Sequence, residues 1–194
     1  QSIVDEYLSD LIEEKTFLQE MRGWSVLRLS YWPIVQFAKE NKIRLVASNA
    51  PSRFANIVSR KGLERLWKLP IESKKFLPPL NSVKEYITPE YEKKLYGSFH
   101  FSGHKFDQTN LLHAQALWDA TMADSILNEC KSNDSKVIHI NGRFHSDDGM
   151  GVTYRLKKMG LKTLTISMFR KDKTFVFEED HSKLADIIYV TGKL

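Results

Sequence analysis

The sequence predicts an α/β domain in which helices flank a mostly parallel sheet. Two observations support this fold class. Segments of helical periodicity alternate with short apolar runs of strand length, and one segment past the middle has the length of a single long helix. The chain has 194 residues, 42% of them hydrophobic, which is enough to bury a core. We therefore expect one α/β domain over residues 1–194, with an irregular, lid-like insertion around 68–106.

The N-terminal part is predicted to be helical. Apolar residues within 5–21 recur at helical spacing with a break in the middle, which predicts two short amphipathic helices. Ser30 is a candidate N-cap for the next helix, which has Pro33 near its first turn and runs to about Asn41. The side chains that this helix is expected to bury are Ile34, Val35, Phe37 and Ala38.

A strand and a helix follow, and then the pattern breaks. Residues 43–47 form an apolar run typical of a strand, and a helix from Ser52 is expected to end at Gly62. Within 68–106 four prolines interrupt any regular element, and only 90–96 suggests a short helix.

The second half contains the clearest periodicity. A long helix is predicted from Asp107 to about Lys131, followed by a buried-type strand at 137–140. A helix at 149–159 should stop at Gly160. The remaining predicted strands are 163–168, about 174–178 and about 186–190.

The net charge, the apolar stretches and the cysteine count exclude several classes of function. The net charge of +5 favours anionic partners such as nucleic acid, acidic lipid headgroups or propionate-bearing ligands like haem. The basic residues are scattered and no basic run exceeds two residues, so we do not expect nucleic acid as a partner. No apolar stretch approaches the roughly 18 residues of a membrane span. The single cysteine, Cys130, excludes an internal disulfide and any multi-cysteine metal site.

The main candidate for chemistry is His145. It follows Asn141 and Gly142 in a polar loop between a predicted strand and a predicted helix, and ligands of open α/β sheets bind beyond the carboxyl ends of strands. The alternative interpretation is a loop that supplies only a turn and a helix cap. The capping residue would then be Ser146, Asp147 or Asp148.

Two further clusters could support a site. Asn49 and Arg53 follow the strand predicted at 43–47, and a guanidinium suits a carboxylate partner. On the long helix, three polar or polarisable side chains lie on one face at positions i, i+4 and i+7: Gln115, Asp119 and Met122. The alternatives are a surface arginine without a ligand and a polar face that only holds the His145 loop.

Tyrosine and histidine supply other candidate ligands. Tyr31 lies beside Trp32 at a predicted helix start, and a tyrosinate can ligate ferric haem, although a core or rim tyrosine is the alternative. His100 and His104 offer imidazoles in the irregular region, whereas His113 and His139 are interpreted as structural. Common catalytic motifs are absent from the sequence, including Gly-x-Ser-x-Gly, the P-loop and His-Glu-x-x-His.

Three blocks in succession resemble the ChaN-type haem-binding proteins, within the group that includes Tiki, TraB and erythromycin-esterase-like proteins. The blocks are Tyr31–Lys39, Val46–Arg53, and Ala114–Ala123 leading to Asn141–His145. Their order and spacing match across roughly residues 1–170.

The resemblance implies a three-layer α/β fold and a haem-binding protein of iron acquisition. It implies Tyr31 as the ligand of the haem iron, with His145, Arg53, Asn49 and Gly142 around the haem. Pocket support would come from Gln115, Asp119, Met122 and Asn141. It also implies homodimerisation around paired haems, outer-membrane uptake components as partners, and a bacterial lipoprotein of the outer membrane.

The chain departs from that family at its start. The family begins with a strand that has a Gly-Glu-x-x-His-like motif followed by an acidic motif, and neither is found here. We expect the chain to be part of a longer precursor. Two other hypotheses stay open: a metal-dependent hydrolase of the Tiki, TraB or erythromycin-esterase kind that uses His145 and Asp119, and an inert structural or partner-binding domain.

Overall fold

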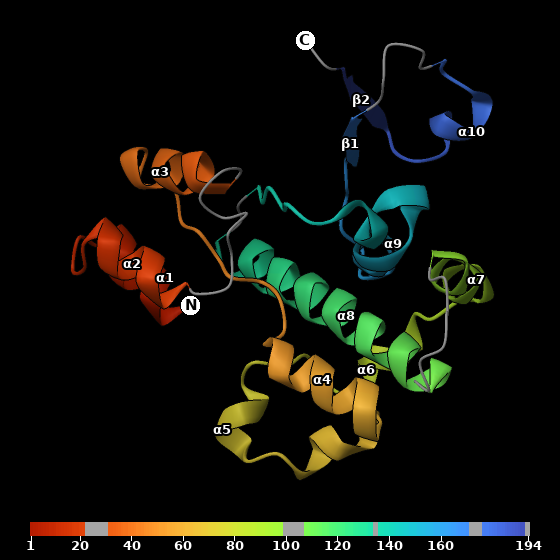
Figure 1. Ribbon diagram of the computed structural model, residues 1–194, viewed down its shortest axis with the longest axis horizontal. Helices are drawn as coiled ribbons and strands as arrows, with labels where there is room; N and C mark the ends of the chain where they lie inside the picture. The colour runs from red at the N-terminus through yellow and green to blue at the C-terminus, as the bar shows by residue number, and fades with distance from the viewer. Residues whose placement is uncertain (22–30, 99–106, 134–135, 171–175, 193–194) are drawn as a thin grey trace. The chain divides into compact units, whose positions relative to one another are not determined.

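The computed structural model describes residues 1–21, 31–98, 107–133, 136–170 and 176–192 (Figure 1). These residues divide into two compact units, 1–47 and 48–194, and each is described by itself. The first unit contains α1 (Ser2–Leu8), α2 (Glu14–Glu20) and α3 (Trp32–Glu40). The elements of the second unit are α4 (Ser52–Lys61), η2 (Leu63–Lys68), α5 (Ile71–Lys74), α6 (Ser82–Glu85), α7 (Pro89–Ser98), α8 (Gln108–Asn133), η3 (Arg143–His145), η4 (Asp147–Gly149), α9 (Gly151–Lys158), β1 (Ile166–Arg170), α10 (Glu179–Ser182) and β2 (Ile187–Thr191).

The first unit is a small helical cluster with an aromatic core. The rings of Tyr7 and Phe17 stack with their centroids 4.6 Å apart, and Val35 of α3 is buried against them. The two short helices predicted within 5–21 are confirmed as α1 and α2. The predicted helix before Asn41 is confirmed as α3, but its expected buried face is partly wrong, because Ile34 and Phe37 are exposed. The expected N-cap, Ser30, lies outside the described residues.

Helix α8 forms the centre of the second unit. Small side chains along it, Ala116 and Ala120 among them, let Phe54 and Val58 of α4 pack closely, and α4 lies along α8 in Figure 1. Met122, Ala123 and Ile126 pack against α9. A helix that is covered on several sides has apolar residues on several of its faces, which agrees with the burial of α8.

Several other predicted elements are confirmed. Helix α4 ends at Gly62, which has φ +84°, and α9 is followed by Gly160 with φ +85°. Glycine reaches this left-handed region without the steric cost of a Cβ. The segment predicted as irregular contains more helix than expected, since α5, α6 and α7 all lie within it. Its role as a lid stays a prediction.

The sheet is smaller than predicted. Strands β1 and β2 pair in parallel, with Ile166 opposite Ile187 and Arg170 opposite Thr191, close to the predicted 163–168 and 186–190. The protein is therefore mixed helix and parallel sheet. Residues 176–178 are irregular, and the rest of the strand expected near 174–178 lies outside the described residues.

Two predicted strands are wrong. Residues 43–47 are irregular. The side-chain amide of Gln1 donates a hydrogen bond to the Leu45 carbonyl and accepts one from the Ala47 N–H. Residues 137–140 are also irregular, and Ile138, expected to be buried, is 90% exposed. A strand needs a neighbour to satisfy its backbone, and within the described residues neither segment has one.

No helix in the described ranges combines the length and apolar character needed to cross a lipid bilayer.

Candidate functional site

A chain of polar side chains links α7, α8 and η3 at the centre of the second unit. Asp119 of α8 has no solvent-exposed surface, and its two carboxylate oxygens have different partners. Its Oδ2 accepts a hydrogen bond from the phenol of Tyr91 at 2.5 Å, and its Oδ1 lies 2.5 Å from Nδ1 of His145. The carboxylate therefore joins an imidazole and a phenol.

Burial explains why Asp119 needs both partners. Moving a carboxylate from water into the low-dielectric interior raises the free energy of the folded state, and each hydrogen bond to the carboxylate offsets part of that increase. Burial raises the pKa of Tyr91, and the nearby charge of Asp119 raises it further. The phenol consequently keeps its proton and remains a donor to the carboxylate.

The geometry assigns the two nitrogens of His145 different roles. Because an ionised carboxylate can only accept, Nδ1 is the nitrogen whose hydrogen points at Asp119, and in the neutral form of the ring Nε2 then has the lone pair. The amide of Gln115 approaches the same ring, 3.2 Å from Nδ1 and 3.5 Å from Nε2. The side chain of His145 is 17% exposed. An oriented, slightly exposed imidazole of this kind can act as a general base or bind a metal through Nε2.

Aromatic rings surround the imidazole. The rings of Trp118 and Phe144 meet that of His145 edge-on, with centroid distances of 6.4 and 6.0 Å. Phe144 also meets Tyr91 edge-on at 6.0 Å. These contacts restrict the orientation of His145 beyond what its hydrogen bonds impose.

Ion pairs hold the loop that contains His145. Arg143 pairs with the buried carboxylate of Asp147 at 2.6 Å, and Lys94 of α7 pairs with Asp148 at 2.9 Å. Lys94 also donates to the backbone carbonyl of Asp147 at 2.7 Å. The interpretation of Ser146, Asp147 or Asp148 as a helix cap is wrong, because the N-cap of α9 is Met150 and no side chain caps it.

Glycine at position 151 keeps the loop close to α8. Its φ is +56°, and a Cβ placed there would lie 2.5 Å from the carbonyl oxygen of His145 and 3.1 Å from Oδ2 of Asp119. No other residue type fits without displacing the site. Gly142, singled out from the sequence, has ordinary extended angles and room for a Cβ.

The structure brings together some of the predicted site residues. Gln115, Asp119 and His145 are in contact, and Asn141 accepts a hydrogen bond from Ser146 at 3.2 Å in the same loop. Met122 lies instead in the apolar core between α8 and α9.

The remaining predicted residues lie elsewhere. Asn49 accepts a hydrogen bond from the Ala50 amide before α4. The guanidinium of Arg53 stacks over the ring of Phe54 at 4.3 Å. Tyr31 belongs to the first unit, where it is the N-cap of α3 and packs, half-buried, against the core of that unit. His100 and His104 lie outside the described residues.

Sequence reasoning missed two members of the site. Tyr91 lies in a region predicted to be irregular, although its place in the first turn of the expected helix at 90–96 was a usable signal. Arg155, also buried, donates to the carbonyls of Ser82 and Val83. His139, interpreted as structural, is mostly buried, and within the described residues its Nε2 has no hydrogen-bond partner.

The described residues contain no group of three or more His, Cys, Asp or Glu side chains arranged to hold a metal ion.

Comparison with known proteins identifies the family. The family model described as haem-binding uptake, Tiki superfamily, ChaN matches residues 1–156, which include Tyr31 and the whole His145 site. No curated protein and no solved structure matches the chain. The predicted resemblance is confirmed: the chain belongs to the ChaN family of haem-binding uptake proteins within the Tiki superfamily.

Proposed function

We propose that this protein binds haem for iron acquisition and that Tyr31 ligates the haem iron. The observation that supports this proposal is the family match over residues 1–156. Tyr31 lies within the match, next to Trp32 and Pro33 at the start of α3, so its backbone position is fixed by a helix terminus. A phenolate oxygen is an established ligand of ferric haem, and the bound haem would supply the iron centre.

Other side chains suit the remaining parts of a haem. Arg53 stacks on Phe54 through the face of its guanidinium, which leaves the N–H groups at its edge suited to a propionate, with Asn49 nearby in the chain. His145, held by Gln115 and Asp119, offers an oriented imidazole with Asn141 and Gly142 in its loop. Met122 would support the His145 region through the core of the second unit. Each of these side chains has the chemistry that one part of a haem requires.

The cellular setting is part of the same proposal. The match itself supports haem binding and uptake. Beyond it, the proposal includes a three-layer α/β fold, a homodimer around paired haems, outer-membrane uptake components as partners, and a lipoprotein of the bacterial outer membrane.

Titration with hemin tests the proposal. We expect the wild type to bind hemin saturably with the charge-transfer bands of a ferric tyrosinate, and Tyr31→Phe to lose those bands. Tyr189→Phe is the matched control, because Tyr189 is exposed in β2 and lies beyond the matched residues. A folded wild type without saturable binding would refute haem binding. An unchanged spectrum in Tyr31→Phe would refute the assigned ligand.

One observation favours a second candidate, a metal-dependent hydrolase. The His145–Asp119 pair has the geometry of a general base whose imidazole is oriented by a buried carboxylate. If the protein hydrolyses an ester or amide without haem, Asp119→Asn should lower kcat by roughly 10³-fold or more, as loss of an orienting carboxylate does elsewhere. Asp124→Asn, on the same helix, is the control. Equal rates in the Asp119→Asn variant and the wild type would exclude this role.

A further inference from the structure

The positive charge of the chain is concentrated in one segment. Residues 53–76 contain seven Lys or Arg and two Glu, a net charge of +5 that equals the formal charge of all 194 residues. The remaining 170 residues therefore have equal numbers of basic and acidic side chains. This segment, which covers most of α4 together with η2, α5 and the turn after it, is called the basic segment below.

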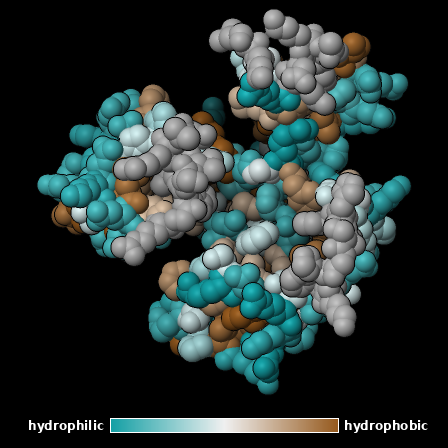
Figure 2. All heavy atoms as spheres, viewed as in Figure 1, coloured by the Kyte–Doolittle hydropathy of each residue, from teal (hydrophilic) through white to brown (hydrophobic). Residues whose placement is uncertain are grey.

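Large apolar side chains on the basic segment face solvent. Trp67 is 50% exposed, Ile71 72% and Phe76 54%. Hydrophobic residues are visible among hydrophilic ones over the α4–α5 region in Figure 2. Single exposed apolar residues are ordinary, but three large ones within ten residues of the chain give this segment an apolar surface that favours an apolar partner.

The local fold explains this exposure. Leu63 and Leu66 of η2 are buried in the core that α8 shares with α4, which fixes the orientation of this short helix. With three residues per turn, the other positions of η2 face outward, and these include Arg65, Trp67 and Lys68. The same packing that buries the leucines therefore presents an aromatic ring together with two cations.

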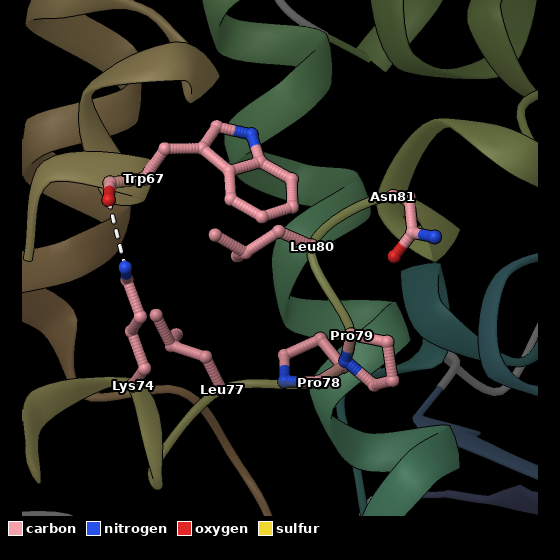
Figure 3. Close-up of a pocket in the computed structure, with 7 residues that line it drawn as sticks. All are labelled: Trp67, Lys74, Leu77, Pro78, Pro79, Leu80 and Asn81. Atoms are coloured by element: carbon pink, nitrogen blue, oxygen red, sulfur yellow. Dashed lines mark hydrogen bonds between the residues drawn. The ribbon is translucent and has the colours of Figure 1, made fainter. Parts of the chain in front are cut away.

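A shallow cavity lies beside Trp67. Trp67, Lys74, Leu77 and the prolines at 78 and 79 line a cavity of about 390 Å³ together with Leu80 and Asn81 (Figure 3). Lys74 spans from α5 to η2, where its ammonium donates to the carbonyl of Trp67 at 2.7 Å. After the end of α5, Phe76 lies under the guanidinium of Arg53 at 5.9 Å. These contacts tie the backbone at Trp67 to α5 and place Phe76 beside Arg53.

Most cations of the segment are free to meet an external anion. Lys75 pairs with Glu72, but within the described residues Arg60, Lys61, Arg65 and Lys68 have no ion-pair partner and are exposed. Cations that surround exposed apolar and aromatic groups match a bilayer with anionic headgroups. The aromatic and aliphatic side chains enter the interface, and the cations remain among the headgroups.

We propose that the basic segment binds the surface of an anionic phospholipid bilayer, with Trp67, Ile71 and Phe76 inserted at the headgroup level. Nucleic acid would use the same cations, but it gives no reason for Ile71, a residue with no aromatic face or charge, to be 72% exposed. An acidic protein would also use these cations, and it is an outcome of the test below. The bilayer accounts for both the charge and the apolar groups.

Vesicle binding tests the proposal. The full chain should sediment with phosphatidylcholine vesicles that contain phosphatidylglycerol and not with pure phosphatidylcholine vesicles. Reversing Arg65 and Lys68 to Glu should weaken this binding by roughly tenfold or more, and added salt should weaken it as well. The matched control reverses Lys157 and Lys162, which are also exposed and lie outside the segment. If both double variants bind the vesicles equally weakly, net charge alone explains the loss of binding, and the assignment of the bilayer contact to the basic segment is overturned.

Bromine-labelled lipids separate insertion from simple attraction. Anionic vesicles with brominated acyl chains should quench tryptophan fluorescence in the wild type and do so much less in Trp67→Phe, which keeps an aromatic ring for insertion and removes only the fluorophore. Quenching that is unchanged in Trp67→Phe would overturn the proposed insertion, because another tryptophan would then be the one that enters the bilayer. Binding to acidic protein or nucleic acid that exceeds binding to anionic vesicles would overturn the proposal in favour of that partner.

Discussion

The carboxylate of Asp119 fixes the orientation of His145, and two residues remote from it in sequence make this possible. Tyr91 satisfies the second oxygen of the carboxylate, so the first oxygen is committed to the imidazole. Gly151 lets the backbone of the His145 loop approach α8. Whether Nε2 of His145 meets a haem or a reacting substrate, its direction is set by these contacts.

Replacing Gly151 with alanine should disrupt this arrangement. The new Cβ would lie 2.5 Å from the carbonyl oxygen of His145, and φ at this position is +56°, so both a collision and backbone strain follow. We expect a loss of roughly 3 kcal/mol or more in the free energy of unfolding. The measurement is urea denaturation together with the NMR signals of the His145 ring.

Gly160→Ala is the control for strain alone. Gly160 has φ +85°, but a Cβ added there would meet no atom within 4 Å, so its replacement should cost only about 1 kcal/mol and leave the His145 signals unchanged. If both variants lose the same free energy, close approach at Gly151 is not important for the site.

Residue spacing predicted half of this site. Gln115 and Asp119 are one helical turn apart, so their common face followed from the sequence, and His145 was singled out by its loop. Tyr91 could not be found in the same way. Its bond to Asp119 spans 28 positions in the chain, and such a contact is set by tertiary packing rather than by local periodicity.

At the scale of elements, helices were predictable and strands were not. Helix α8 closes its own backbone hydrogen bonds, so a local pattern is enough to predict it. The runs at 43–47 and 137–140 have strand composition, yet a strand also needs a partner, and within the described residues only β1 and β2 pair. The apolar composition of a segment predicts that it is hydrophobic but does not predict whether another strand pairs with it.

Arg155 is expected to hold α6 against α9. Helix α6 ends after four residues, which leaves the carbonyls of Ser82 and Val83 without helical partners, and the buried guanidinium donates to them at 3.0 and 2.7 Å. Arg155→Met should therefore lower the free energy of unfolding by about 3 kcal/mol. Chemical denaturation measures this loss.

The control on the same helix is Lys157→Met. Lys157 is exposed, so its replacement should change the free energy of unfolding by about 0.5 kcal/mol or less. Arg155→Lys should be intermediate, because an ammonium keeps the charge but not the planar fork that reaches two carbonyls. A loss in Arg155→Met no greater than in Lys157→Met would refute the role of Arg155.

At the scale of the whole molecule, the distribution of charge was less visible from the sequence than its amount. A search for basic runs finds none longer than two residues, yet the net charge lies in residues 53–76 because acidic residues balance the cations elsewhere. The fold places this excess charge on the surface, because Leu63 and Leu66 are buried and the residues beside them face outward. Local counts of basic residues could not predict this surface.

Stability of the whole fold should fall in mild acid because two partly buried histidines, His113 and His139, are harder to protonate in the folded state than in the unfolded chain. Burial lowers the pKa of His139 below 6.5, and the nearby His145 lowers it further, against an opposing effect of Asp119. Burial, with a smaller effect of Lys84, also lowers the pKa of His113. Below pH 6.5 the unfolded chain therefore binds protons that the native state does not, and protonation favours unfolding.

We expect the free energy of unfolding to be constant near pH 8 and to decrease as the pH falls below about 6.5, by at most about 1.4 kcal/mol per histidine for each pH unit, and we would follow it to about pH 5.5. Carboxylates with lowered pKa, such as Glu90, lose their contribution only near and below 4.5, outside this window. His139→Gln should remove part of the decrease, and His113→Gln combined with it should remove most of the rest. Denaturation of each variant at pH 8 gives the cost of the substitution itself. A decrease between pH 6.5 and 5.5 that is as steep in the double variant as in the wild type would mean that other groups set the acid sensitivity of the fold.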